Sequence, residues 1–237
     1  MKQERTLSIE GKEYTLLISD EPQALLEAKA SGRAVLGCLD TGNGEGASRD
    51  FQGIPYVVPS MEYVTEELLE LILRRYLGLP WLIDETERLY IREFVKEDAE
   101  NIPEEEYGKE EEIFRDPDKL EVYIKNQYGF YEYGTWAVLK KSPSLLIGMA
   151  GVSNPNLPET ALQALPTLPD DLCWLELGYH IFKPYRKNGY ATEAAKAILS
   201  YSHEVLSARL CAWIEAKKQG LLRTGRKPWN GSSKSYF

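Results

Sequence analysis

A basic, glycine-containing turn at residues 186–192, Arg-Lys-Asn-Gly-Tyr-Ala-Thr, has the clearest chemistry in this sequence. It follows an apolar segment and precedes a long amphipathic one, so we expect a strand to lead directly through this turn into a helix. The first N–H groups of a helix have no partner within it and lie at the positive end of the helix dipole. The turn therefore predicts an anion site, for example for a phosphate group.

The segments on either side of the turn favour this arrangement. Residues 172–181 are apolar apart from Glu176 and His180, as expected of a buried central strand. After the turn, small and apolar residues recur at three- and four-residue spacing, which indicates one packed face of a helix. The residues of that face are Ala191, Ala194, Ala195, Ile198, Leu199, Ser202, Val205 and Leu206. The small residues near the helix start would let a ligand approach the backbone.

The pattern at residues 186–191 also carries a family resemblance. Arg-x-x-Gly-x-Ala, followed by Thr-Glu-Ala, resembles the pyrophosphate-binding signature Arg/Gln-x-x-Gly-x-Gly/Ala of the GNAT superfamily of acetyl-CoA-dependent N-acyltransferases. The resemblance implies that acetyl-CoA is the co-substrate, and that the preceding strand splays from its neighbour and accepts the pantetheine arm. The cofactor-binding residues that it implies are Leu177, Gly178, Tyr179, Arg186, Lys187, Asn188, Gly189, Tyr190, Ala191 and Thr192.

The resemblance begins at about residue 84. Residues 86–92, Thr-Glu-Arg-Leu-Tyr-Ile-Arg, resemble the opening strand of the GNAT branch that includes the ribosomal-protein acetyltransferases, and Asp98-Ala99 resembles the start of its first helix. The fold class that this implies is α/β (α+β), with a mixed, mainly antiparallel sheet flanked by helices. We therefore expect a GNAT domain over residues 84–237, preceded by a small α/β domain.

Periodicity places the remaining elements of the GNAT domain. We expect a helix at 118–128, a hairpin of strands at 134–140 and 145–153, an irregular loop at 154–170 and a strand at 208–215. In the family plan, the loop and the acidic run at 97–112 lie near the groove for the acceptor substrate. The acidic run either attracts a positively charged amine or is a solvated helix face.

Residues 1–81 indicate a separate small α/β domain with the element order β-α-β-β-α. Its expected strands are 14–18, 34–39 and 56–58, and its expected helices are 21–31 and 65–77. The glycine-rich stretch 42–47 either binds a phosphate or is a flexible loop, and the absence of a helix pattern after it favours the loop. This domain is similar to the N-terminal extension of some bacterial GNAT proteins.

Acetyl transfer to an amine needs a held thioester, a polarised carbonyl and a neutral amine. A primary amine with a pKa near ~10 is mostly protonated at neutral pH, so a base must take its proton. Glu176 fits the position of the active-site carboxylate of the family and is the candidate general base; alternatively, it is a glutamate satisfied by structural hydrogen bonds. The side chains of Tyr179 and His180 are interpreted as structural. The expected acceptor is a primary amine of a protein N-terminus, an amino acid or a small molecule.

The sequence departs from the family after the strand at 208–215. The Asn-x-x-Ser and Lys-x-Gly-Phe motifs and the tyrosine acid of the family are not recognisable, so the GNAT domain is expected to be incomplete after about residue 216. If one adenine is removed from the codons of Lys217-Lys218, the codons downstream can read a family-like motif, and we hypothesise a frameshifted tail. The chain is then an active acetyltransferase or a non-catalytic acyl-CoA-binding protein. A third alternative is an acidic interaction module.

Composition limits the other function classes. The formal charge of −9 over 237 residues argues against a nucleic-acid partner, and no segment has the apolar length of a membrane span or signal peptide. We expect a cytoplasmic location. The cysteines at 38, 173 and 211 lie in apolar segments and are expected to be buried free thiols. With two histidines and no carboxylate constellation, no metal site is expected.

Overall fold

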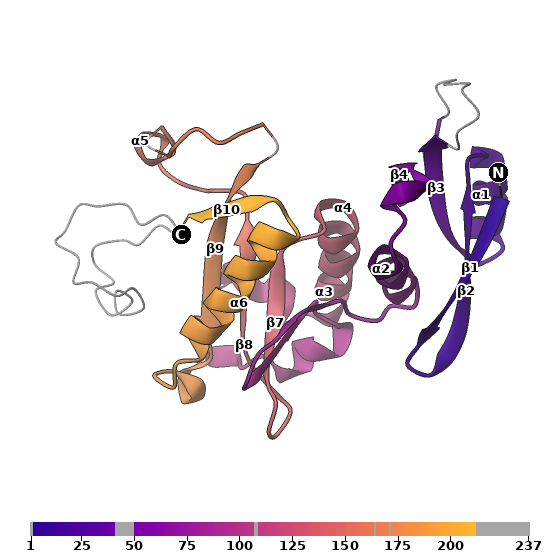
Figure 1. Cartoon of the computed structure of the whole chain (residues 1–237). Helices are drawn as coiled ribbons and strands as arrows, with labels where there is room; N and C mark the ends of the chain where they lie inside the picture. Colours follow the sequence, from indigo (N-terminus) through magenta and orange to yellow (C-terminus); the bar gives the residue numbers. More distant parts are fainter. Residues whose placement is uncertain (1, 41–49, 107–108, 164, 171, 212–237) are drawn as a thin grey trace. The chain divides into compact units, whose positions relative to one another are not determined.

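A computed structural model describes residues 2–40, 50–106, 109–163, 165–170 and 172–211 (Figure 1). The chain divides into two compact units, Met1–Trp81 and Leu82–Phe237, which we call the N-terminal and C-terminal units. The glycine-rich stretch 42–47 and the tail after residue 211 lie outside the described residues.

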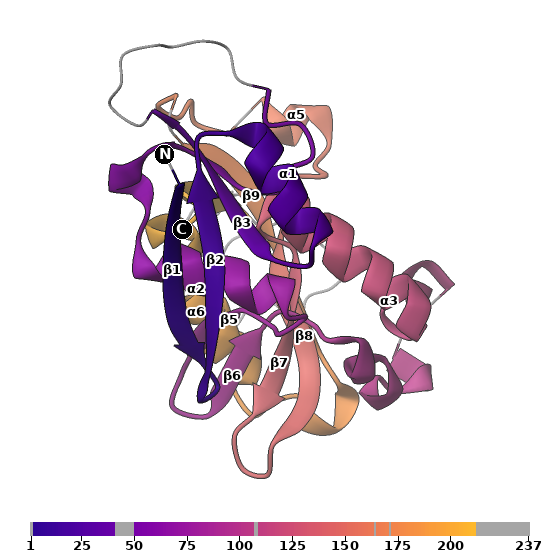
Figure 2. The ribbon, with the colours of Figure 1, turned by 90° about the vertical axis from the view of Figure 1, so that its right-hand side faces the viewer.

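The N-terminal unit is built on a four-stranded sheet of order β1-β2-β3-β4. β1 and β2 form an antiparallel hairpin, seen side by side in Figure 2, whereas β2, β3 and β4 are parallel. The elements are β1 (Lys2–Ile9), β2 (Lys12–Ser19), α1 (Pro22–Ala30), β3 (Ala34–Asp40), β4 (Val57–Ser60), a 3₁₀ turn at Met61–Tyr63 and α2 (Glu66–Tyr76).

Each face of this sheet is covered by one helix. Alternate residues of a strand point to opposite faces, and Leu17 of β2 packs with Leu25 of α1. Its neighbour Leu16 packs with Leu69 of α2 in a second cluster. The expected element order β-α-β-β-α corresponds to β2, α1, β3, β4 and α2, whereas no strand was expected before residue 14.

The C-terminal unit contains a six-stranded sheet of order β10-β9-β8-β7-β6-β5. All neighbouring strands are antiparallel except β9 and β10, which are parallel. The strands are β5 (Leu82–Glu85), β6 (Leu89–Arg92), β7 (Thr135–Lys140), β8 (Leu145–Ser153), β9 (Cys173–Ile181) and β10 (Ala208–Cys211). This mixed, mainly antiparallel sheet confirms the expected fold class.

Helices cover both faces of this sheet. α6 (Tyr190–Glu204) connects β9 to β10 and lies across one face, where Trp136 of β7 meets Tyr201 with ring centroids 5.6 Å apart (Figure 1). On the other face, Ala137 packs with Leu120 of α3 (Pro117–Tyr123). A π turn at Ile124–Tyr128 and α4 (Gly129–Tyr131) continue α3. In the sequence, α5 (Glu159–Leu162) comes between β8 and β9.

Several local expectations were wrong. The acidic run forms short 3₁₀ turns, Lys96–Asn101, Glu104–Glu106 and Lys109–Phe114, because Pro103 interrupts it and its like charges repel at helical spacing. The loop 154–170 contains α5. Of the cysteines, Cys38 and Cys211 are buried free thiols as expected, but Cys173 is exposed.

Burial along β9 and α6 also differs from the pattern expected. Only Leu175 and Ile181 of β9 are buried, because hydrogen bonding on both edges of a strand does not require both of its faces to be covered. On α6 the buried residues include Ala197, which the spacing did not select, whereas Val205 is 52% exposed beyond the helix end.

Candidate functional site

The β9–α6 junction has the geometry of an anion site. β9 ends at Ile181, a 3₁₀ turn follows at Lys183–Tyr185, and α6 begins at Tyr190 after Gly189 as N-cap. The first helical hydrogen bond runs from the Glu193 N–H to the Gly189 carbonyl, at 3.1 Å. The amides of residues 189–192 therefore lie outside the helical hydrogen-bond ladder, at the positive end of the dipole. We call residues 183–192 the junction turn.

The shape of the junction turn depends on residues in the left-handed conformation. Lys187 has a φ of 65° and Gly189 a φ of 81°. A Cβ at Gly189 would also lie 3.4 Å from Nη2 of Arg88. The Asn188 side-chain amide donates to the carbonyls of Tyr185 and Arg186, each at 3.1 Å, and so closes the turn on itself.

An ion pair anchors the first turn of α6 to the β5–β6 connection. Glu193 lies 2.6 Å from Nη2 of Arg88 and accepts from the Thr86 hydroxyl at 2.6 Å and the Arg88 N–H at 3.0 Å. Arg88 also donates to the Asn188 carbonyl at 3.0 Å and lies over the ring of Tyr190, 4.6 Å from its centroid. Burial alone would raise the pKa of Glu193, but the donors from Thr86 and Arg88 hold that pKa below its usual value.

Sequence reasoning did not find the anchoring role of Arg88. The residue was noted only as part of a strand signature, and its partner lies more than a hundred positions later in the chain. The two signals that exist are the acidic residue in the first helical turn and the nearby Thr86. Neither of them indicates which cation approaches.

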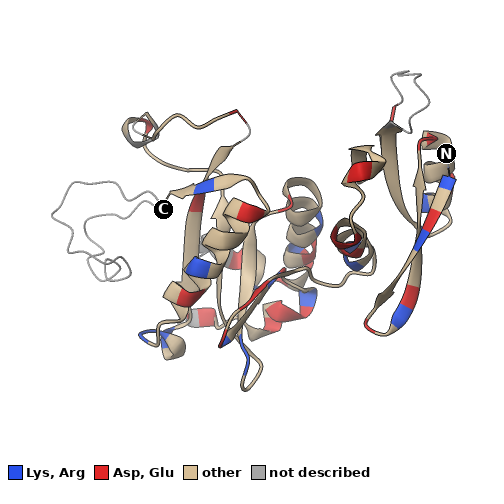
Figure 3. Cartoon of the chain, viewed as in Figure 1, with Lys and Arg blue, Asp and Glu red and all other residues tan. Residues whose placement is uncertain are grey.

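Arg186, the first residue of the signature, is also paired. Its Nε donates to the Ile181 carbonyl at 2.7 Å, and its Nη2 lies 2.6 Å from Oε2 of Glu106, a residue of the acidic run. His180 Nε2 lies 3.1 Å from the same carboxylate oxygen. Lys183 and Lys187 add positive charge to the same turn (Figure 3).

Leu177, Gly178 and Tyr179 occupy the middle of β9. On one edge they pair with β8, opposite Val152, Gly151 and Ala150 respectively. On the other edge, the pairing with β10 that the structure describes ends at Glu176 opposite Cys211. A Cβ at Gly178 would meet open space. Burial raises the pKa of Tyr179, which favours its neutral phenol.

Glu176 lies on β9 between Ser153 of β8 and Cys211 of β10. Its Oε2 accepts a hydrogen bond from the Asn156 N–H at 2.9 Å, and the side chain is partly exposed. Burial and then the Glu176 charge raise the pKa of the Cys211 thiol. The structure thus places Glu176 on the same strand as residues 177–179 and towards the opposite end from the junction turn.

The acidic run does not present a uniform field of free carboxylates. Glu104 pairs with Arg115 at 3.0 Å and Glu112 pairs with Lys119 at 3.0 Å. The Glu106 side chain is only 5% exposed and is ion-paired with Arg186 of the junction turn. These side chains therefore connect elements of the unit, and they weaken the case for the run as an attractor of amines.

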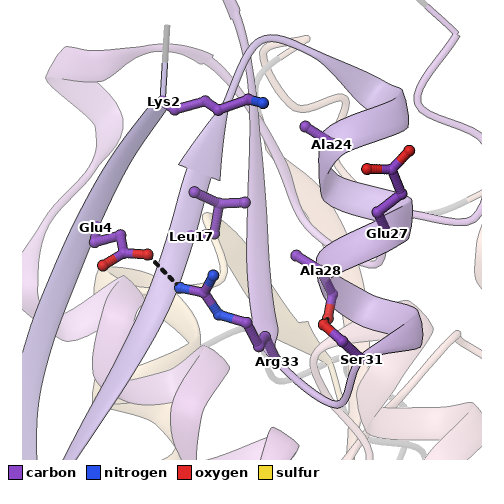
Figure 4. A pocket seen from close by; sticks show the side chains of 8 residues that line it. All are labelled: Lys2, Glu4, Leu17, Ala24, Glu27, Ala28, Ser31 and Arg33. Atoms are coloured by element: carbon purple, nitrogen blue, oxygen red, sulfur yellow. Dashed lines mark hydrogen bonds and ion pairs between the residues drawn. The ribbon is translucent and has the colours of Figure 1, made fainter.

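A depression of about 510 Å³ in the N-terminal unit lies between β1, β2 and α1 (Figure 4). Its floor includes Leu17 and Ala28. Two of its charged groups are ion-paired, since Arg33 lies 2.6 Å from Glu4 and Lys2 lies 3.3 Å from Glu21. Glu27, which also lines it, accepts a hydrogen bond from the Gln23 side chain at 3.1 Å.

In the described part of the chain, no group of three or more His, Cys, Asp or Glu side chains could hold a metal ion. None of the helices in that part combines the length and apolar character that crossing a membrane requires.

Comparison with known proteins gives a family match over the C-terminal unit. The family model described as an acetyltransferase (GNAT) domain matches residues 88–226. No curated protein matches the chain. Solved structures similar to part of it include a GNAT-family acetyltransferase from Bacillus anthracis, with 20% identity, 59% of this chain and 78% of that chain covered, and a TM-score of 0.41.

Two other solved structures show comparable similarity. An acetyltransferase from Agrobacterium tumefaciens has 19% identity, 58% and 76% coverage of the two chains and a TM-score of 0.38. A ribosomal-protein-S5-alanine acetyltransferase from Vibrio fischeri has 15% identity, 60% and 78% coverage and a TM-score of 0.43. The family match itself spans more than half of the 237 residues and includes the whole β9–α6 junction. On that ground, the chain belongs to the GNAT family of acetyltransferases.

Proposed function

We propose that this protein transfers an acetyl group from acetyl-CoA to a primary amine. The observation that carries the proposal is the junction turn, where a glycine N-cap leaves the first amides of α6 outside the helical ladder beside basic side chains. A pyrophosphate fits such a site because backbone N–H groups and a helix N-terminus both favour oxyanions.

The residues proposed to hold the CoA pyrophosphate are those of the signature. The backbone amides of Lys187, Asn188, Gly189, Tyr190, Ala191 and Thr192 provide the donors. Arg186 supports them from the first position of the signature, although its guanidinium also pairs with Glu106. This pairing favours a role in which Arg186 shapes the turn as well as contributing charge.

The pantetheine arm is proposed to lie along Leu177, Gly178 and Tyr179. These residues hydrogen-bond with β8 on one edge, and their other edge lies beyond the described pairing with β10. We propose that this edge of β9 pairs with the amides of the extended pantetheine arm in the way that it would pair with another strand. The strand would then aim the thioester towards Glu176.

We propose Glu176 as the general base. A carboxylate is a weak base beside an alkylammonium, so the neutral fraction of the amine is the form that attacks. Its nitrogen bonds to the carbonyl carbon, one N–H proton passes to Glu176 directly or through water, and the C–S bond breaks. The sulfur leaves with the bonding electrons and takes up a proton from solvent, and Glu176 gives its acquired proton back to solvent. Bound acetyl-CoA supplies the activated acyl group in this step. The hydrogen bond from Asn156 fixes the carboxylate while leaving its other oxygen for this role.

We also propose that residues 1–81 form a separate small domain and that residues from 84 onward form the transferase domain. The division of the chain after Trp81 supports this boundary. The acceptor is proposed as a primary amine of a protein N-terminus, an amino acid or a small molecule.

The first test is a thermal-shift titration of the full chain with acetyl-CoA. A ligand that binds only the native state raises the melting temperature as its concentration increases. The shift should be lost in Gly189→Glu, which places a carboxylate in the junction turn. Gly78→Glu is the matched control, because Gly78 has a φ of 71°, similar to that of Gly189, but follows α2 in the N-terminal unit.

A saturable shift that the control keeps and Gly189→Glu loses would support the cofactor site and justify screening amines for CoA release. A folded wild-type protein without any shift would refute the proposal. A thermal shift without turnover on a broad panel of amines would support acyl-CoA binding and would reject the proposed acetyl transfer.

A further inference from the structure

A buried carboxylate holds the junction turn from the side of the acidic run. Glu106 ends the 3₁₀ turn Glu104–Glu106, and its side chain is only 5% exposed. Its Oε1 accepts from the Lys183 N–H at 2.6 Å, and its Oε2 accepts from Arg186 Nη2 at 2.6 Å. The same Oε2 lies 3.1 Å from His180 Nε2.

The three partners of Glu106 lie on either side of the end of β9. His180 is the penultimate residue of β9, Lys183 opens the 3₁₀ turn, and Arg186 is the first residue of the signature. One carboxylate therefore fixes the strand end, a backbone amide and a guanidinium together. The next residue, Lys187, already has a left-handed backbone conformation with a φ of 65°. A displacement of Arg186 would therefore also displace the backbone amides that follow it in the turn.

The surroundings of Glu106 favour its ionised form. Burial alone would raise the pKa of Glu106, but the Lys183 amide, His180 and Arg186 hold that pKa below its usual value. Removing the Glu106 carboxylate while its partners remain costs free energy, because the Lys183 amide and the Arg186 guanidinium lose their acceptor.

We propose that Glu106 is a positioning residue that fixes the geometry of the anion-binding junction turn. This inference rests on the proposed function, in which that turn receives the CoA pyrophosphate. The contrary hypothesis is that Glu106 competes with the pyrophosphate for Arg186. The two differ in sign: removing a positioning residue weakens acetyl-CoA binding, whereas removing a competitor strengthens it.

The first measurement is amide hydrogen exchange of the ligand-free full chain, in peptides covering residues 183–190. Glu106→Ala removes all three contacts, and Glu106→Gln keeps an acceptor oxygen for the Lys183 amide but loses the charge. We expect exchange in these peptides to rise by roughly tenfold in the alanine variant and by less in the glutamine variant. Peptides of α3 and β7 should keep their wild-type exchange, which shows that the unit is folded.

The matched control is Glu112→Ala. Glu112 belongs to the same acidic run and also accepts from a lysine, but its side chain is 64% exposed and does not contact the junction turn in the described contacts. Amide hydrogen exchange of residues 183–190 in Glu112→Ala should equal that of the wild type. Unchanged exchange in Glu106→Ala would overturn the inference.

The second measurement is the Kd for acetyl-CoA by calorimetry on the same proteins. We expect a rise of roughly tenfold or more in Glu106→Ala, partial recovery in Glu106→Gln and no change in Glu112→Ala. A purely structural role would lower the melting temperature without changing the Kd of the folded molecules. An unchanged or lower Kd in Glu106→Ala would therefore overturn the positioning role.

The two measurements separate failure of this inference from failure of the proposed function. A wild-type chain that does not bind acetyl-CoA refutes the proposed function. In that case the exchange comparison, which needs no ligand, still decides whether Glu106 fixes the turn.

Discussion

Glu193→Ala should destabilise the C-terminal unit by about 2–3 kcal/mol. The side chain is 18% exposed and accepts hydrogen bonds from the Thr86 hydroxyl, the Arg88 N–H and the Arg88 guanidinium. A hydrogen bond to a charged group contributes about 1.5–3 kcal/mol, and the three share one carboxylate, so their effects do not add fully. Loss of a negative charge from the first turn of α6 adds about 0.5 kcal/mol.

Tryptophan fluorescence in urea measures this effect without interference from most of the N-terminal unit. No tryptophan precedes Trp81 in the sequence, and Trp136 is fully buried against Tyr201 of α6. The difference in unfolding free energy follows from the midpoint and the slope of the transition. Unequal slopes would mark a departure from two-state unfolding, which a chain of two units can show.

The matched control is Glu204→Ala at the other end of α6. Glu204 is exposed and accepts only from the Ser200 hydroxyl, at 3.0 Å, among the described contacts, and its charge opposes the helix dipole there. Its removal should change stability by less than about 0.5 kcal/mol. If Glu193→Ala falls within the same limit, the anchoring role argued for the Arg88–Glu193 pair is wrong.

The same pair predicts a pH dependence. Because the folded-state pKa of Glu193 is lowered, the carboxylate contributes stability that is present above its unfolded pKa of about 4.3 and is lost as pH falls through the folded pKa. Glu193→Gln should remove this part of the acid sensitivity. Equal loss of stability between pH 5 and pH 3 in wild type and variant would contradict the assignment.

Other substitutions test single features of the fold and site. Gly189→Ala should cost about 1–2 kcal/mol, because the φ of 81° is unfavourable for a residue with a Cβ, and urea unfolding measures it. Glu176→Gln should lower the rate of CoA release on a responsive amine by about 100-fold or more while leaving the acetyl-CoA thermal shift intact; an unchanged rate would remove Glu176 as base. Thr65→Ala should cost ~1 kcal/mol through loss of the N-cap bond to the Leu68 amide, at 3.1 Å, and faster amide exchange in α2 would report it.

Local patterns predicted much of the fold because the local forces agreed with the tertiary ones. α6 was placed within two residues, since its apolar spacing, acidic first turn and glycine N-cap all indicate the same helix. β1 was not found because an edge strand can be polar: of its residues only Ile9 is buried. Its pairing with β2 depends on the turn at Glu10-Gly11, where both residues have positive φ, rather than on a hydrophobic pattern.

The candidate site was predictable in part for the same reason. The residues of the junction turn are consecutive in sequence, so a short motif can describe them. Arg88 and Glu106 approach that turn from distant segments, and no periodicity records such contacts. Glu106 was hidden further because it stands in a run of glutamates that composition alone assigns to solvent.

The carboxylates of Glu106 and Glu193 determine where the positive potential of the junction turn originates. Arg88 is paired with Glu193 and Arg186 with Glu106, so a carboxylate compensates the charge of each arginine. The remaining attraction for an anion comes from the backbone amides ahead of Glu193 and from Lys183 and Lys187. Amides attract an anion only when they converge on it, whereas lysines act over a longer range. The geometry of the turn, and hence the residues that anchor it from either side, should therefore control affinity more strongly than the number of basic residues in the motif.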